Sequence, residues 1–187
     1  MTKQNYKSAD LFSRWLANAI DSGISFAILL ILIYIAHFIG KFLVSTDIKG
    51  SYELIAILAV LLISLIYPLI IEPWIVARKG GSIGKLLLKL KIVKEDTKNY
   101  LSFKRSFVRS FLKFFILDVV GSFVAMVNII MIFMDEKRQA GHDRFVDTWV
   151  VQNLNEKSLI KGVIVFILII ILNISLITGL ILIISNL

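Results

Sequence analysis

The sequence has no cysteine, and only two histidines and two prolines occur in its 187 residues. Without cysteine the chain forms no disulfide, no thiolate metal site and no cysteine nucleophile. The two histidines, His37 and His142, lie far apart and no motif joins them, so we expect no metal site and no cofactor. No nucleophile stands in a recognisable catalytic motif either. The sequence therefore predicts a protein that is not an enzyme.

Charge is scarce in three long apolar stretches. Residues 15–39 contain one acid, Asp21, residues 54–77 contain Glu72, and residues 160–185 contain a single lysine near their start. About 20 apolar residues are enough for a helix to cross the hydrocarbon core of a bilayer. Apolar residues make up 58% of the chain, against roughly 45–50% in soluble domains. The sequence therefore predicts an all-α membrane protein, a transmembrane helix bundle with spans at these three places.

Positive charge is concentrated in one segment. The net charge is +8, and eleven Lys or Arg with two acids lie from Arg78 to Lys113. Such a block binds either nucleic acid or the anionic lipid of a membrane surface. Spans on both sides favour lipid, because cytoplasmic loops of membrane proteins are rich in Lys and Arg. We therefore expect anionic lipids and no nucleic acid as partners. By the same rule we expect the N-terminus in the cytoplasm, because the segment before the first span carries Lys3, Lys7 and Arg14.

A four-residue unit repeats along the segment at about 102–113 and continues to residue 115. It places phenylalanine four residues apart, at Phe103, Phe107, Phe111 and Phe115. Basic residues follow the same spacing two residues out of phase, at Arg105, Arg109 and Lys113. At about 100° per residue the two sets lie on nearly opposite faces of a helix. We expect an interfacial amphipathic helix whose basic face contacts lipid headgroups. The alternative is a soluble core helix with a solvated basic face.

A third, weaker apolar stretch at about 114–134 contains Asp118, and it either crosses the membrane or enters and returns. Five Lys or Arg lie between residues 135 and 161, and none lies in the C-terminal tail. This asymmetry favours the re-entrant topology, with residues 135–161 in the cytoplasm. There KLKIVK (89–94), which alternates apolar and basic residues, has TWVVQ (148–152) as its expected partner in a small strand pair. Their pairing requires both segments on the same side.

The first span has one polar face. Arg14 and Asp21 lie on it at helical spacing, together with Asn18, Ser22 and Ser25. An aspartate inside a span costs ~2.5–3.5 kcal/mol on insertion scales, so Asp21 must face protein or water rather than lipid. Arg14 lies ~10 Å from Asp21 along the helix axis, and each therefore needs another partner. Glu72 and Asp118 are candidates for the same polar interior, although Glu72 can equally reach toward water.

The segment GGSIGK at residues 80–85 resembles a phosphate-binding loop, but its glycine spacing is one residue short. Leu86 also replaces the Ser or Thr that would hold magnesium. We expect instead a glycine turn where the chain leaves the second span. His142 stands beside Asp143, but no Ser or Cys nucleophile accompanies the pair in a motif. We expect a loop histidine that hydrogen-bonds locally.

Four segments in this order, SRWLANAID, GGSIGKLLLKLKIVKED, SFKRSFVRSF and RQAGHDRFVDTWVV, resemble the RDD family over residues 10–152. The family is named for one arginine and two aspartates, and the matching positions are Arg14, Asp21 and Asp143. The helix at 160–185 is an addition to the family's usual core, and Asp147 stands where we would expect a small residue. The resemblance implies a multi-pass protein of the bacterial inner membrane. It also implies ion or small-ligand transport, with cation/proton exchange in some members.

Two functional hypotheses follow. In the first, the protein is a small transporter in which Asp21 carries a proton or cation. Arg14 and Asp143 then form an ion pair that closes the bundle at its cytoplasmic face. In the second, the three residues only orient and lock helices, and the protein is a non-catalytic membrane module that binds and regulates another membrane protein. The expected protein partner is a second copy of the chain, in a homo-oligomer, or another membrane protein.

Overall fold

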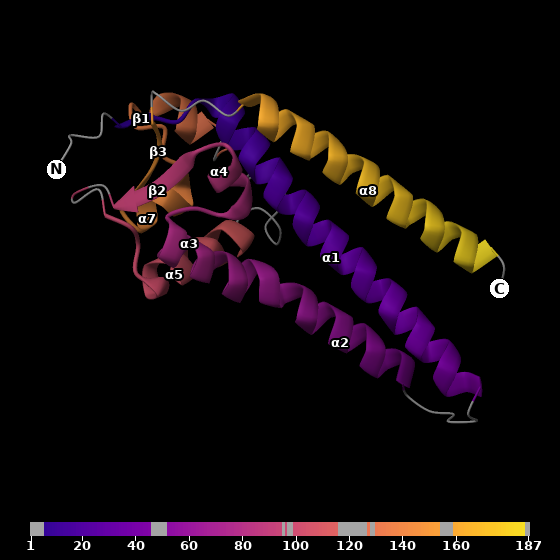
Figure 1. Ribbon diagram of the computed structural model, residues 1–187. Helices are drawn as coiled ribbons and strands as arrows, with labels where there is room; N and C mark the ends of the chain where they lie inside the picture. The colour runs from indigo at the N-terminus through magenta and orange to yellow at the C-terminus, as the bar shows by residue number, and fades with distance from the viewer. Residues whose placement is uncertain are drawn as a thin grey trace.

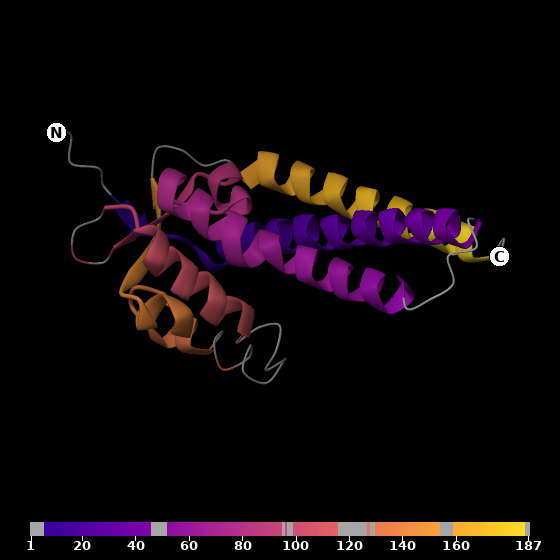
Figure 2. The same cartoon turned by 90° about the horizontal axis from the view of Figure 1, so that it is seen from below.

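The computed structural model describes residues 6–45, 52–94, 96, 99–115, 127, 130–153 and 159–185. Three long helices extend from a group of short helices and strands: α1 (Leu11–Ser45), α2 (Tyr52–Ile66) and α8 (Leu159–Ser185). Figure 1 shows this group around the start of α1, whereas α8 ends at the opposite side of the molecule. In Figure 2, α1 lies beside both α2 and α8. We call the side that holds the short elements the sheet end.

Three helical stretches are long and apolar enough to cross a membrane: Leu11–Phe42, Ile57–Leu87 and Leu159–Ile183. They confirm the helical membrane fold predicted from the stretches at 15–39, 54–77 and 160–185. α1 has 35 residues and a length of about 52 Å at 1.5 Å per residue, which exceeds the ~30 Å of a hydrocarbon core. Apolar side chains on the outer faces of these helices are exposed, for example Leu62 (67%) and Leu168 (59%). This is the surface expected of helices that face lipid.

The second span is not one uniform helix. α2 continues into a π-helical turn, η1 (Tyr67–Ile71), and then into α3 (Glu72–Lys79). The N–H of Glu72 donates to the oxygen of Tyr67, five residues back. Pro68 and Pro73 account for the wider turn, because a proline ring crowds the carbonyl four residues before it and has no N–H to donate. Turns of this kind are frequent at functional sites, and Glu72 follows this one directly.

A small antiparallel sheet, in the order β1-β3-β2, contains three strands: β1 (Tyr6–Ser8), β2 (Leu90–Lys94) and β3 (Thr148–Asn153). β2 pairs with β3 from Leu90 opposite Gln152 to Lys94 opposite Thr148. This confirms the pair expected from KLKIVK and TWVVQ, whereas the pairing of β1 with β3 was not predicted. The three strands come from the segments before α1, after α4 and before α8. These three segments therefore lie at the same end of the bundle.

The third apolar stretch, 114–134, lies mostly outside the described residues, and Asp118 does so too. α5 (Phe103–Phe114) precedes the stretch, and α7 (Gly141–Phe145) follows it. Arg109 of α5 contacts Asp143 of α7 directly, and both helices lie at the sheet end (Figure 2). The two flanks of the stretch are therefore close together, the arrangement that a re-entrant topology requires.

The buried core lies where the start of α1 meets the sheet and α4 (Ile83–Leu87), a short helix that follows α3 at the end of the second span. α1 begins directly after Asp10, whose carboxylate accepts the N–H of Ser13 at 2.8 Å and caps the helix. The apolar core includes Leu16, Ile20, Leu88, Leu90 and Val150. This core fixes the first turns of α1 against α4 and the sheet, and so positions the polar face of α1.

Candidate functional site

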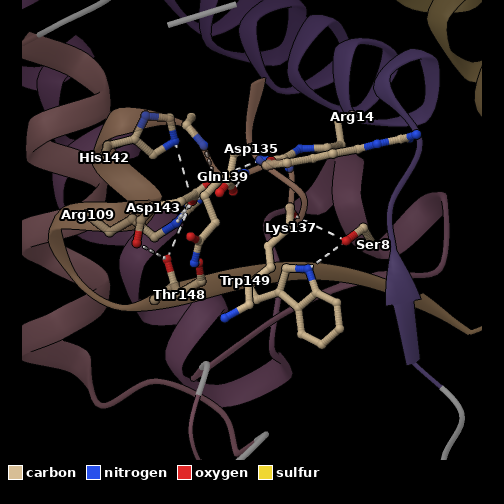
Figure 3. A network of polar contacts seen from close by, with 12 residues as sticks. Ser8, Arg14, Arg109, Asp135, Lys137, Gln139, His142, Asp143, Thr148 and Trp149 are labelled. Carbon is tan, nitrogen blue, oxygen red and sulfur yellow. Dashed lines mark hydrogen bonds and ion pairs between the residues drawn. The ribbon is translucent and has the colours of Figure 1, made fainter. Parts of the chain in front are cut away.

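At the sheet end, the carboxylate of Asp143 forms ion pairs with two arginines (Figure 3). Arg14 Nη2 lies 2.7 Å from Asp143 Oδ2, and Arg109 Nη2 lies 2.6 Å from Asp143 Oδ1. Arg109 Nε donates to the same Oδ1 at 2.8 Å. Asp143 is fully buried (0% exposed) and Arg109 nearly so (1%). The predicted ion pair between Arg14 and Asp143 is confirmed, and Arg109 is a second partner that was not predicted. We call these three residues the ion-pair cluster.

The segment RQAGHDRF places Asp143 in the first turn of α7. The N–H of Ala140 donates to Asp143 Oδ2 at 3.4 Å, and Thr148 Oγ1 donates to Asp143 O at 3.1 Å. Gln139 Nε2 in turn donates to Thr148 O at 3.0 Å. A carboxylate is favourable in the first turn of a helix, because the unpaired N–H groups there carry positive partial charge. Asp143 therefore ties α1, α5 and β3 to one short helix.

The two arginines determine the charge of Asp143. Burial by itself raises the pKa of a carboxyl group, but Arg109 and Arg14 outweigh it and hold the pKa of Asp143 well below its usual range. Burial also lowers the pKa of the neighbouring His142 to about 3, so this imidazole is neutral at physiological pH. His142 Nε2 lies 3.5 Å from Asp143 Oδ1. The cluster thus holds one carboxylate between two guanidinium groups.

The basic face of α5 points into the protein. Arg109 binds Asp143, and Lys113 Nζ lies 3.4 Å from Glu72 Oε1 of α3. The headgroup contact predicted for Arg109 and Lys113 is therefore wrong, because buried carboxylates of α7 and α3 bind this face instead. The alternative of a solvated basic face is wrong for the same reason. Arg105 is half-buried, and its headgroup contact stays a prediction.

The opposite face of α5 is exposed and aromatic. Ring centroids along it are 6.3 to 6.4 Å apart, and the exposed rings are those of Phe103, Phe107, Phe111 and Phe115. The four-residue repeat therefore separates a protein-facing polar side from an outward-facing apolar side, which is the reverse of the usual arrangement in water.

Asp21 accepts hydrogen bonds from the glycine turn between α3 and α4, at the end of the second span. Ser82 Oγ donates to Asp21 Oδ2 at 2.5 Å, and the N–H of Gly84 donates to Asp21 Oδ1 at 2.7 Å. Lys85 Nζ lies 3.9 Å from Oδ2. Asp21 is 2% exposed, which confirms that polar groups shelter this carboxylate. A Cβ at Gly84 would lie 2.1 Å from Ala17 O, so glycine is required for the turn to approach α1 this closely.

Two further residues of the polar face of α1 also point inward. Lys85 Nζ donates to Asn18 Oδ1 at 2.9 Å, and Ser25 Oγ donates to the backbone oxygen of Asp21 at 3.1 Å. Lys85 therefore connects two positions of α1, one turn apart. The structure thus brings Asn18 and Ser25 close to Asp21, and Glu72 is also buried.

A cavity of about 290 Å³ lies between α1, the second span and α5. Its wall carries the carboxylates of Asp21 and Glu72 and the ammonium group of Lys113. All three elements contribute serine hydroxyls, from Ser22, Ser25, Ser64 and Ser110. Ser110 is 3% exposed, and its hydroxyl has no hydrogen-bond partner within the described residues. The cavity is thus a partly open space between helices, lined by apolar side chains and by a group of charged and hydroxyl-bearing residues.

Lys113 is charged in this cavity. Burial by itself lowers the pKa of an amine, but Glu72 and Asp21 outweigh it and raise the pKa of Lys113 above its ordinary value. The wall therefore offers fixed charges of both signs, with hydroxyls that can ligate a small cation or ordered water. In the part of the chain that the structure describes, no three or more His, Cys, Asp or Glu come together as a metal site.

The long apolar helices, the buried charges and the polar cavity define a multi-pass helical membrane protein with a polar interior. Residues 8–147 match the RDD family. Because this match covers most of the chain, the chain belongs to the RDD family. The matched range contains Arg14, Asp21 and Asp143 and ends before α8. Searches of curated proteins and of solved structures found no match.

Proposed function

We propose that the protein is a small membrane transporter, not an enzyme, and that it moves protons or small cations through the cavity. One observation carries this proposal: two acidic residues and four serines line a cavity between α1, the second span and α5, and the first two of these elements are long and apolar enough to span a membrane. Ionisable groups inside a span are costly, and in membrane proteins they mark ion pathways and proton relays. Asp21 lies in the cavity wall, whereas Arg14 and Asp143 lie in the ion-pair cluster.

We further propose that the protein lies in the bacterial inner membrane with its sheet end in the cytoplasm. The basic segment from Arg78 to Lys113 gathers at this end, and positively charged loops favour the cytoplasmic side. Exposed basic side chains there are the groups that would contact anionic lipids, and they include Arg78, Lys79 and Lys104.

Flux through purified protein in proteoliposomes tests the transport proposal. An imposed pH gradient should collapse faster than in empty vesicles, with Na⁺ or K⁺ on the opposite side as the exchanged ion. Ser64→Leu places a larger apolar side chain in the cavity wall and should lower this flux. Ser175→Leu is the matched control and should leave the flux unchanged, because Ser175 is exposed on α8 and does not line the cavity.

Absence of proton, Na⁺ and K⁺ flux from folded wild-type protein would refute transport of these ions. The second hypothesis would then stand, namely a membrane module that binds and regulates another membrane protein. Co-purification from native membranes identifies such a partner, and cross-linking in the membrane detects a homo-oligomer.

A further inference from the structure

The two carboxylates in the cavity wall are held very differently. Asp21 accepts two hydrogen bonds, at 2.5 and 2.7 Å, from the glycine turn. Within the described residues Glu72 has one side-chain partner, Lys113, at 3.4 Å. Hydrogen bonds between charged groups are usually about 2.7–2.9 Å long. The Glu72–Lys113 contact is therefore the looser of the two and the easier to exchange for another ligand.

Lys113 and Ser110 allow Glu72 to exchange its partner, because one has a movable ammonium group and the other an unpaired hydroxyl within the described residues. Lys113 reaches Glu72 from α5 on a flexible four-carbon stem, so its ammonium group can move while the helix stays in place. Ser110 lies three residues earlier on α5 and lines the same cavity. Its buried hydroxyl has no hydrogen-bond partner within the described residues. Such a group costs free energy, and a ligand bound beside it would remove that cost.

We propose that Glu72 and Lys113 form the exchange site of the transporter. The Glu72 carboxylate binds in turn the Lys113 ammonium group and the transported proton or monovalent cation, with the Ser110 hydroxyl as a further ligand for a cation. This inference rests on the proposed transport function. In the structure Lys113 occupies the carboxylate as a tethered cation. When a proton binds a Glu72 carboxylate oxygen, or a cation binds beside it, Lys113 withdraws, and it returns when the ligand leaves.

Under this assignment Asp21 is a positioning residue. Its hydrogen bonds to Ser82 and Gly84 hold the end of the second span against α1, and so keep the cavity wall in place. Exchange of a ligand at Asp21 would require both of these bonds to break. At Glu72 it requires one side chain to move.

The charges around Glu72 favour a monovalent ligand. Lys113, Lys85 and Arg109 act electrostatically on it, and Asp21 is the second acidic residue that lines the same cavity. Lys113 also interacts with Asp21, which can serve as its counter-ion when it leaves Glu72. One positive charge can thus replace another at the carboxylate. A divalent cation would leave excess positive charge in a buried site, which is costly.

Flux measurements on variants of the full chain test this assignment. Glu72→Gln removes the charge and keeps the shape, and it should lower flux by at least about 100-fold, as expected for loss of a positioned proton-transfer group. Lys113→Gln should shift the pH profile of the flux to higher pH and lower the flux at neutral pH, because a carboxylate without its tethered cation binds a proton more tightly and releases it more slowly. Flux with a pH gradient alone, and then with Na⁺ or K⁺, distinguishes a proton from a metal cation as the ligand.

The double variant Glu72→Gln/Lys113→Gln separates exchange from a structural role. It removes both charges and leaves two neutral amides that can hydrogen-bond to each other. Its thermal midpoint should therefore lie closer to wild type than that of Glu72→Gln, while its flux should stay as low. Asp21→Asn should mainly lower the thermal midpoint, and its flux should fall less than that of Glu72→Gln, because Asp21 holds the cavity wall and can act as the counter-ion of Lys113 but does not bind the ligand.

Several results would overturn the assignment. Undiminished flux in Glu72→Gln, or recovered flux in the double variant, would remove Glu72 as the carrier and leave the transport proposal intact. Loss of flux in Asp21→Asn at an unchanged thermal midpoint would transfer the role to Asp21. Absence of flux in the wild-type protein would refute the transport proposal itself, and the assignment with it.

Discussion

Arg14 at the start of α1 binds Asp143 at 2.7 Å, across 129 positions of the sequence. Arg109 of α5 occupies the other oxygen of the same carboxylate. Removing one partner from a buried ion pair is costly, because the charge left behind stays buried without a counter-ion. The cluster therefore fixes α1, α5 and α7 relative to one another, and this role does not depend on whether the cavity transports an ion.

Asp143→Asn should destabilise the protein by about 3–5 kcal/mol, because two buried arginines lose their counter-ion. Thermal unfolding of the protein in detergent, followed by circular dichroism, measures the loss. Asp96→Asn is the matched control, since Asp96 pairs with Lys94 at 3.8 Å and its side chain is 69% exposed. The control should change stability by no more than about 0.5 kcal/mol. Equal losses in the two variants would contradict the role of the cluster.

The burial of His142 should make the stability of the protein depend on pH. Burial lowers its pKa to about 3 in the folded protein, whereas the unfolded chain has a histidine pKa near 6.5. Between these values the unfolded chain binds a proton that the folded protein does not. Stability should therefore fall as the pH drops below about 6.5, by up to about 1.4 kcal/mol per pH unit.

Denaturant unfolding at a series of pH values checks this slope. The window from about pH 6.5 to 4.5 is the informative one, because most carboxylates of the unfolded chain take up protons only below it. His142→Gln should flatten the curve in this window. A slope that the substitution leaves unchanged would show that His142 takes up its proton without unfolding.

Gly84→Ala should push the backbone of α4 away from α1 and so disturb the hydrogen bonds to Asp21. The added Cβ would lie 2.1 Å from Ala17 O and 3.1 Å from Asp21 Oδ1, so α4 would have to move away from α1. We expect a loss of about 1–3 kcal/mol, the usual cost of overpacking, measured as a lower thermal midpoint. In Gly179→Ala the new Cβ would meet the hydroxyl of Tyr34 at 2.2 Å. That hydroxyl ends a side chain that can turn aside, so this control should lose less.

The spans and the strand pair could be predicted because their patterns are local. Long apolar runs identify membrane helices wherever they lie, and alternation within KLKIVK indicates a strand. Which face of α5 is turned toward the protein could not be predicted in this way. Its repeat shows that two faces differ but not which one meets protein. The carboxylates that decide this, Asp143 and Glu72, lie 34 and 41 positions away from Arg109 and Lys113.

The hydrogen-bond partners of Asp21 could not be predicted, for a different reason. Its burial followed from the cost of a carboxylate in a span, but its ligands lie 61 and 63 positions away, at Ser82 and Gly84. The sequence did carry a sign of them, because GGSIGK resembles an anion-binding loop. Glycine-rich turns expose backbone N–H groups to anions in general. Here the anion is a carboxylate of the same chain, a possibility that a comparison with phosphate-binding loops alone does not suggest.

Asp147 lies in the turn between α7 and β3, at a position where the resemblance to the RDD family led us to expect a small residue. Its φ is 52°, in the left-handed region, where glycine is the least strained residue and aspartate is tolerated better than most others. Asp147→Gly should therefore stabilise the protein, by up to about 1 kcal/mol, and Asp147→Ala should destabilise it. Thermal midpoints of the two variants and the wild type test the order. If the alanine variant proved the most stable, the side chain of Asp147 and not its backbone would determine stability at this turn.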